Sequence, residues 1–296
     1  MRTVLFLTDF SIRADHAAHY ALKFAQGTNA DLLVCNVFLV SSNDSMFSPG
    51  GDENTDRESK EEDRNFDLDE LSERLERVAK NEFSNTGFLP RIKYCSRSGS
   101  LAKSVNDIAT KYNITTAVIS MHGAGMLSTL LLGDHVEAVI EKATCPVLVV
   151  PEVADFRKLK KIAFATDLNH GDIQVIHSLV ELAKYTNAEL IIIHITEDSQ
   201  VDSYDHTRLT NFINLVSTKI NYEQIYYRSI ENDNIPDSLN SLLREPDIDI
   251  LAVVHRKRNF LQKLFNGSVT QKLADNLNKP LFIFPRVKET TDLPVF

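Results

Sequence analysis

The chain has few cysteines, no long apolar run and none of the common short catalytic motifs. Cys35, Cys95 and Cys145 are far apart in the sequence and lack metal-ligand spacing, so we expect reduced core residues of a cytoplasmic protein. No apolar run approaches the roughly 18 residues of a membrane span, and the N-terminal segment does not resemble a signal peptide. A G-x-S-x-G elbow, a GKS or GKT phosphate loop, an H-E-x-x-H zinc motif and an SGG-x-D-S pyrophosphatase loop are all missing. These absences argue against an enzyme and against a metal site.

The negative charge of the chain is concentrated in one segment. The formal net charge is −9 in 296 residues, and residues 41–70 alone contain eleven acidic and three basic side chains. This balance argues against a nucleic-acid partner, and the rest of the chain is close to neutral. Residues 41–64 are polar, include Pro49-Gly50-Gly51 and show no periodicity, which predicts a disordered or loosely ordered insertion.

The two halves of the chain are a repeat. Thr8-Asp9 align with Thr166-Asp167 at an offset of 158 residues, whereas Gly133 aligns with Gly267 at an offset of 134. The second half therefore lacks 24 residues of the first, and the gap falls at the acidic insertion, about 41–64. We expect two domains, at 1–151 and 158–287.

Each half alternates apolar runs of strand length with segments of helical periodicity. We expect strands at 4–8, 31–38, 91–95, 116–120, 146–150, 161–166, 188–195, 224–227, 250–255 and 280–284. We expect helices at 13–27, 67–83, 101–111, 173–185, 208–220 and 235–244, and one more after the glycine loop of each half. Such alternation makes a parallel sheet with helices on both faces. The fold class is therefore α/β, with two tandem five-stranded, Rossmann-like domains that pack as a pseudo-two-fold pair through their closing strands.

Each half opens with a strand that ends in Thr-Asp and closes with a loop, a glycine, a helix and an apolar strand led by proline. In these features the chain resembles the tandem form of the universal stress protein family, over nearly its whole length. Members of that family that bind ATP carry G-x-x-G, nine residues, and then G-[S/T]. The resemblance implies an adenine-nucleotide α-hydrolase-like fold with the nucleotide at the carboxyl ends of the strands, where open α/β sheets generally bind ligands. Glycines allow a close approach of backbone to phosphate, and a helix N-terminus attracts phosphate oxygens.

The first half keeps two of the three motif glycines. The motif positions hold Ser120, Gly123 and Gly133, and the hydroxyl residue is replaced by Asp134. As an N-cap, the carboxylate would fill the anion site itself, and its repulsion of a phosphate would cost on the order of 1–4 kcal/mol. Mg²⁺ bridging the carboxylate and the phosphate would relieve that repulsion.

The second half keeps the other part of the motif. Gly267-Ser268 are present, but the loop positions hold Val254 and Lys257 within the basic run 255–258. Arg and Lys side chains can bind a phosphate from a greater distance than a glycine backbone does. One interpretation is thus an altered anion site, and the other is a solvated basic loop.

The resemblance implies four further ligand-binding positions. Asp9 and Asp167 follow the first strand of each half and would face the nucleoside, while Val37 and Ile195 lie where the base is contacted through backbone atoms. A second interpretation, which can hold at the same time, is that each aspartate or the next polar residue, Ser11 or Asn169, caps the following helix.

We therefore expect a cytoplasmic protein that binds and senses a ligand, with a degenerate site for ATP or another adenine nucleotide in each half. We expect no membrane partner; protein partners are unknown, and a further association of two chains is left open. One alternative is a protein-interaction module that has lost nucleotide binding, with the acidic insertion as its docking segment. The other is an enzyme that hydrolyses ATP or transfers a nucleotidyl group and uses His122, Asp134 or the basic run 255–258.

Overall fold

The computed structural model describes the backbone of residues 2–38, 53–85, 87–121, 134–152, 154, 156, 158–196, 203–256 and 279–286. The side chains of these residues are described as well, except those of 53–61, 134–135 and 203–205. All statements below concern this part of the chain.

The first half forms five parallel strands in the order β3-β2-β1-β4-β5. Its strands are β1 (Thr3–Thr8), β2 (Asp31–Phe38), β3 (Ile92–Ser98), β4 (Ile114–Ser120) and β5 (Val147–Val150). Its helices are α1 (Ile12–Gly27), α2 (Glu53–Phe83), α3 (Leu101–Tyr112) and α4 (Asp134–Lys142). The predicted alternation of strands and helices is confirmed in this half.

The second half repeats the first strand for strand, in the order β8-β7-β6-β9-β10. Its strands are β6 (Lys161–Thr166), β7 (Glu189–Thr196), β8 (Ile225–Glu231), β9 (Ile250–Val254) and β10 (Leu281–Phe284). Its described helices are α5 (Asp172–Thr186), α6 (Ser203–Lys219) and α7 (Ile235–Arg244). The helix expected after Gly267 lies outside the described residues.

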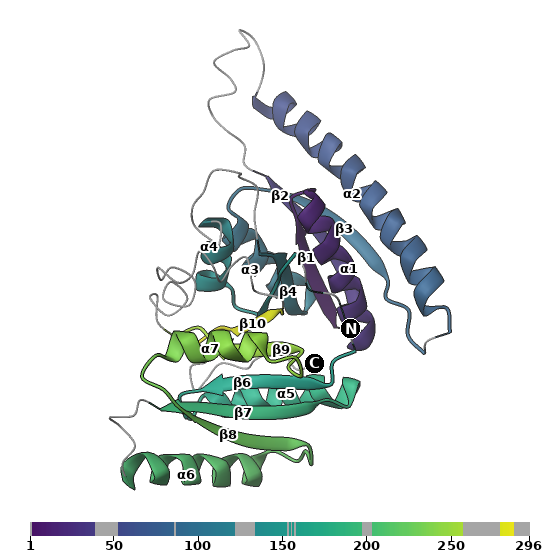
Figure 1. Ribbon diagram of the computed structural model, residues 1–296. Coiled ribbons are helices and arrows are strands. Elements are labelled where there is room, and N and C mark those ends of the chain that lie inside the picture. Colours follow the sequence, from purple (N-terminus) through teal and green to yellow (C-terminus); the bar gives the residue numbers. More distant parts are fainter. Residues whose placement is uncertain are drawn as a thin grey trace.

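The two halves join through their closing strands into one ten-stranded sheet (Figure 1). β10 pairs with β5 antiparallel, with Phe282 opposite Leu148, and this is the antiparallel step in an otherwise parallel sheet. The Phe282 ring also packs edge-on against Phe24 of α1, with 6.2 Å between the ring centroids. The predicted packing of the halves through their closing strands is confirmed.

Alternate residues of the buried strands feed two cores, one on each face of the sheet. In β1, Val4 and Phe6 belong to the core covered by α1, α2, α5 and α6, whereas Leu5 and Leu7 belong to the core covered by α3, α4 and α7. Both cores run across the two halves. The helices therefore cover the two faces of one continuous sheet, and the loops after the strands lie at the carboxyl-end edge of each half.

One expectation about the acidic insertion is wrong. Residues 53–64 continue α2 as regular helix and do not form a loop, and Figure 1 shows α2 as the longest helix of the chain. The segment lacks an apolar stripe but contains no Pro or Gly after Gly51, and its Glu, Lys and Arg residues are good helix formers. Once Leu68, Leu71 and Leu75 anchor the helix on the core, extending it N-terminally needs no new nucleation. Residues 41–52 lie outside the described residues.

Candidate functional site

Both halves build the same strained turn after their first strand. The threonine that ends the strand accepts a hydrogen bond on Oγ1 from the backbone N–H two residues later, from Phe10 to Thr8 (3.0 Å) and from Leu168 to Thr166 (2.9 Å). Phe10 and Leu168 have φ of 60° and 61°, in the left-handed region that bulky residues rarely adopt. Such strain persists where the surroundings impose it, and it is common at functional sites. The turn holds the intervening aspartate at the carboxyl end of the sheet.

The second strand of each half supports this turn from the side. Asn36 donates from Nδ2 to the carbonyl oxygen of Thr8 (2.8 Å), and His194 Nδ1 lies 3.1 Å from the carbonyl oxygen of Thr166. Because a carbonyl oxygen only accepts, the proton of this bond is on His194 Nδ1. Asn36 and His194 occupy equivalent positions in the repeat, so the support is the same in both halves.

The polar residues after the turn have different roles in the two halves. Asp9 accepts from Ser11 through both the backbone N–H (3.0 Å) and the hydroxyl (2.6 Å), and Ser11 accepts from Ala14 N (3.2 Å) as the N-cap of α1. In the second half Asn169 accepts from Gly171 N (3.0 Å), and α5 has no side-chain cap. The capping interpretation is thus confirmed for Ser11 and wrong for the second half.

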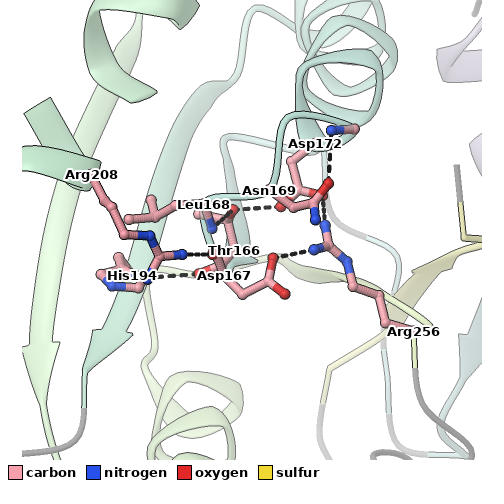
Figure 2. Close-up of polar contacts among 9 residues, drawn as sticks. Thr166, Asp167, Leu168, Asn169, Asp172, His194, Arg208 and Arg256 are labelled. Atoms are coloured by element: carbon pink, nitrogen blue, oxygen red, sulfur yellow. Dashed lines mark hydrogen bonds and ion pairs between the residues drawn. The ribbon is translucent and has the colours of Figure 1, made fainter. Parts of the chain in front are cut away.

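The second half contains a cluster of two ion pairs, one buried and one exposed (Figure 2). Asp172, the first residue of α5, is 1% exposed and accepts from the Thr166 hydroxyl (2.5 Å). Arg256 lies between the two aspartates and pairs with both Asp172 and Asp167 (Figure 2). Arg208 of α6 donates to the backbone carbonyl of Asp167 (3.0 Å). The end of β6, the start of α5 and the residues after β9 are thereby tied together.

At Asp172, burial raises the pKa more than the attraction to Arg256 lowers it. Burial raises the pKa of this carboxyl to about 6, although the Arg256 guanidinium and the Thr166 hydroxyl both favour the charged form. The nearby Asp167 carboxylate raises the pKa further. Asp172 therefore changes charge close to neutral pH.

A cavity of about 290 Å³ opens beside this cluster at the carboxyl ends of β6, β7 and β9. Its polar end contains Thr166, Asp167, Asp172 and Arg256. Its walls are apolar: Ala165, Ile195, Ile235, Leu239, Val253 and Val254. The place is the one where open α/β sheets bind ligands.

The structure brings two of the predicted site residues together, since Asp167 and Ile195 both line this cavity. Asp9 ends the equivalent turn of the first half, and Val37 is partly buried near the end of β2, opposite Arg97. Asp134 is the first residue of α4, and its side chain is not described. The remaining predicted residues lie outside the described part of the chain: Gly123, Gly133, Lys257, Gly267 and Ser268.

Three parts of the site were missed from the sequence. Asp172 aligns with Ala14 of the first half, so a comparison of the repeats gives no sign of it. The apolar wall from α7, Ile235 and Leu239, looks like ordinary core in the sequence. Arg256 lies in the basic run, where the sequence points to phosphate as its partner and gives no sign of two aspartates about 90 residues earlier.

Two kinds of feature do not occur within the described segments. No group of three His, Cys, Asp or Glu side chains there is placed to hold a metal ion. No helix in those segments is long and apolar enough to cross a membrane.

Two Rossmann-like halves joined edge to edge, each with a Thr-Asp turn at the carboxyl end of its first strand, define a tandem α/β protein. The chain belongs to the universal stress protein family, whose sequence profile matches residues 1–151 and again residues 158–285. No curated protein sequence matches the chain.

Solved structures show the same fold over nearly the whole chain. A universal stress protein from Archaeoglobus fulgidus is 17% identical, with a TM-score of 0.62, over 96% of this chain and 98% of its own. A functionally unknown protein from Pseudomonas aeruginosa PAO1 is 14% identical, with a TM-score of 0.55, over 96% of this chain and 92% of its own. A putative universal stress protein from another strain of that species is 12% identical, with a TM-score of 0.50 and the same coverage. At these identities the likeness concerns the fold.

Proposed function

We propose that the protein is a binding and sensing protein that holds the nucleoside part of an adenine nucleotide in the cavity of its second half. The cavity itself carries this proposal. It has apolar walls with polar groups gathered at one end, and its volume of about 290 Å³ is near the lower end of the roughly 300–1,000 Å³ usual for ligand pockets. That division suits a planar base against the walls and a ribose at the polar end.

The polar end would select hydroxyl groups. The Asp167 side chain is 63% exposed and paired on one oxygen with Arg256, which leaves capacity to accept hydrogen bonds from a ribose. A phosphate would have to draw Arg256 away from both aspartates, because the guanidinium is already neutralised. We therefore expect the nucleoside to supply most of the affinity and the phosphates, with or without Mg²⁺, to add little.

The first half would contain a second, more degenerate site. Its turn presents Asp9 at the equivalent place, but Ser11 donates twice to Asp9 Oδ1 and also caps the start of α1. Binding through that oxygen or at the helix start would thus require these internal hydrogen bonds to rearrange.

Binding without catalysis is part of the same proposal. The Thr166 hydroxyl donates to Asp172, and both cavity carboxylates accept from Arg256, so these groups are engaged with one another. Thr166 Oγ1 also accepts from the Leu168 N–H, so the hydroxyl that Asp172 could deprotonate is already used on both sides within the turn. We place this action in the cytoplasm, where the three free cysteines would be kept reduced.

Thermal unfolding with adenosine, AMP, ADP and ATP, with and without Mg²⁺, tests the proposal. A ligand at about 100 times its Kd stabilises the folded chain by about 2.7 kcal/mol. Ile235→Phe fills the cavity from α7, and Leu101→Phe makes the same change at the equivalent first residue of α3. We expect Ile235→Phe to abolish the shift and Leu101→Phe to keep it.

A shift that survives Ile235→Phe would place the ligand elsewhere in the chain and refute this site. If none of the four ligands gives a shift, the protein is not a nucleotide sensor, and a protein-interaction module remains. Deletion of residues 42–64 would then be expected to abolish partner binding without lowering the melting temperature.

A further inference from the structure

Two of the three cysteines, 60 residues apart in the sequence, face each other across neighbouring strands. Cys35 of β2 and Cys95 of β3 are direct partners in the parallel register. Neighbouring strands lie about 4.7–4.9 Å apart, within the roughly 4.4–6.8 Å between Cα atoms that a disulfide spans. Both side chains lie on the face covered by α3 and pack with the same core, and both thiols are free.

The two thiols differ in exposure and in the direction of their pKa shifts, so they differ in reactivity. The hydrogen bond with Cys35 lowers the pKa of the partly exposed Cys95, and the Arg97 and Lys111 cations lower it further against the effect of burial. The same interaction, together with full burial, raises the pKa of Cys35. Cys95 is thus the better nucleophile, since the thiolate is the reactive form, and Cys35 keeps its proton.

β3 is the edge strand of the sheet in the described part of the chain. A small shift of Cys95 toward β2 therefore breaks no pairing with a second described strand. The second half has no such pair, because Ile193 faces Arg228 at the equivalent place. The fold therefore forms without thiols at this point of the sheet. Cys145 is buried two residues before β5, and burial raises its pKa to about 12.

We propose that Cys95 and Cys35 form a peroxide-responsive thiol pair that closes to an intrachain disulfide between β2 and β3. The Cys95 thiolate attacks one oxygen of hydrogen peroxide, the O–O bond breaks, and hydroxide leaves as Cys95 becomes a sulfenic acid. The Cys35 proton then passes to the sulfenic oxygen of Cys95 as the Cys35 sulfur attacks the Cys95 sulfur; the S–O bond breaks, the S–S bond forms, and water leaves. The peroxide is reduced and the two thiols are oxidised to one disulfide.

Peptide mapping of the folded full-length protein tests this. The wild type is exposed to hydrogen peroxide, its remaining thiols are blocked with N-ethylmaleimide, and it is digested without reduction. We expect one crosslinked pair of peptides, Cys35 with Cys95, lighter by two hydrogens than the sum of its parts. We also expect Cys95 to be consumed about tenfold or more faster than Cys145, which follows from its exposure and its thiolate character.

Three variants separate the steps. Cys35→Ala, which also removes the hydrogen bond that lowers the pKa of Cys95, should leave Cys95 as a more slowly formed sulfenic acid that dimedone traps. Cys95→Ala should abolish oxidation at this rate, and Cys145→Ala should behave as the wild type. Cys35 is fully buried, so its variant is first checked for a cooperative melt, whereas the wild-type map does not depend on any variant. Equal slow loss of all three thiols, a Cys95–Cys95 link between chains, or sulfenic acid in the wild type without a crosslink would each overturn the proposal.

Discussion

Replacement of Asp172 by Asn should make the protein more stable than the wild type at neutral pH and leave it nearly unchanged in acid. Asp172 is 1% exposed, and burial raises the pKa of its carboxyl from 3.8 to about 6 in the folded state. In the unfolded chain the carboxyl regains its ordinary pKa. The folded state therefore binds a proton more readily than the unfolded state does between about pH 4 and pH 6, and ionisation over that window costs stability.

The size of the effect follows from the shift. One pKa unit corresponds to about 1.4 kcal/mol, so a shift of about two units is worth about 3 kcal/mol. We expect the unfolding free energy of Asp172→Asn minus that of the wild type to rise by about this much from pH 3.5 to pH 7. Urea denaturation at a series of pH values measures both free energies, and Asp167→Asn, which removes the exposed partner of the same guanidinium, is the matched control.

The sign of the slope decides between two forces. A difference that falls as the pH rises would mean that attraction to Arg256 exceeds the cost of burial and that the pKa of Asp172 is lowered. A flat difference would mean that the two cancel. Either result would refute the argument that burial dominates at this carboxyl.

Two other predictions concern the stability of the fold that supports the site. Phe282→Ala should lower the unfolding free energy by about 3–5 kcal/mol in urea denaturation, because the ring is fully buried where β10 meets α1 of the other half. Phe66→Ala, at a 73% exposed ring, is its control, and an equal loss in both variants would contradict the argument. Asn29→Ala should cost about 1–2 kcal/mol, since Asn29 has φ of 51°, while Asn29→Gly should be nearly neutral in thermal unfolding. Similar stability of the two Asn29 variants would show that the left-handed backbone there carries no cost.

The sequence predicted most strands and helices because buried parallel strands are short apolar runs and their covering helices have apolar stripes. It also predicted how the halves pack, since each closing strand would otherwise be an open edge. The N-terminal part of α2 was missed because it is a polar helix with no apolar periodicity to reveal it.

The site was only partly predictable for a different reason. Asp167 and Ile195 were predicted through the resemblance to the family, whereas Asp172 departs from the repeat and its partner Arg256 is 84 residues away. The pairing of Cys35 with Cys95 depends on strand register, which sequence spacing does not contain.

The two halves pair through β5 and β10 but belong to one chain. Their interface is therefore free of the sequence symmetry that a dimer of identical chains must keep. In an isologous dimer every substitution at the interface occurs twice, so each side must remain complementary to itself. In this chain Phe24 of the first half contacts Phe282 of the second. The repeat places Leu182 at the position equivalent to Phe24 and Leu148 at the position equivalent to Phe282, so the two halves differ at this contact. The same independence allowed an ionic cluster in one half and a thiol pair in the other. Together, the two proposals would make one chain respond to two different chemical signals through a single continuous sheet.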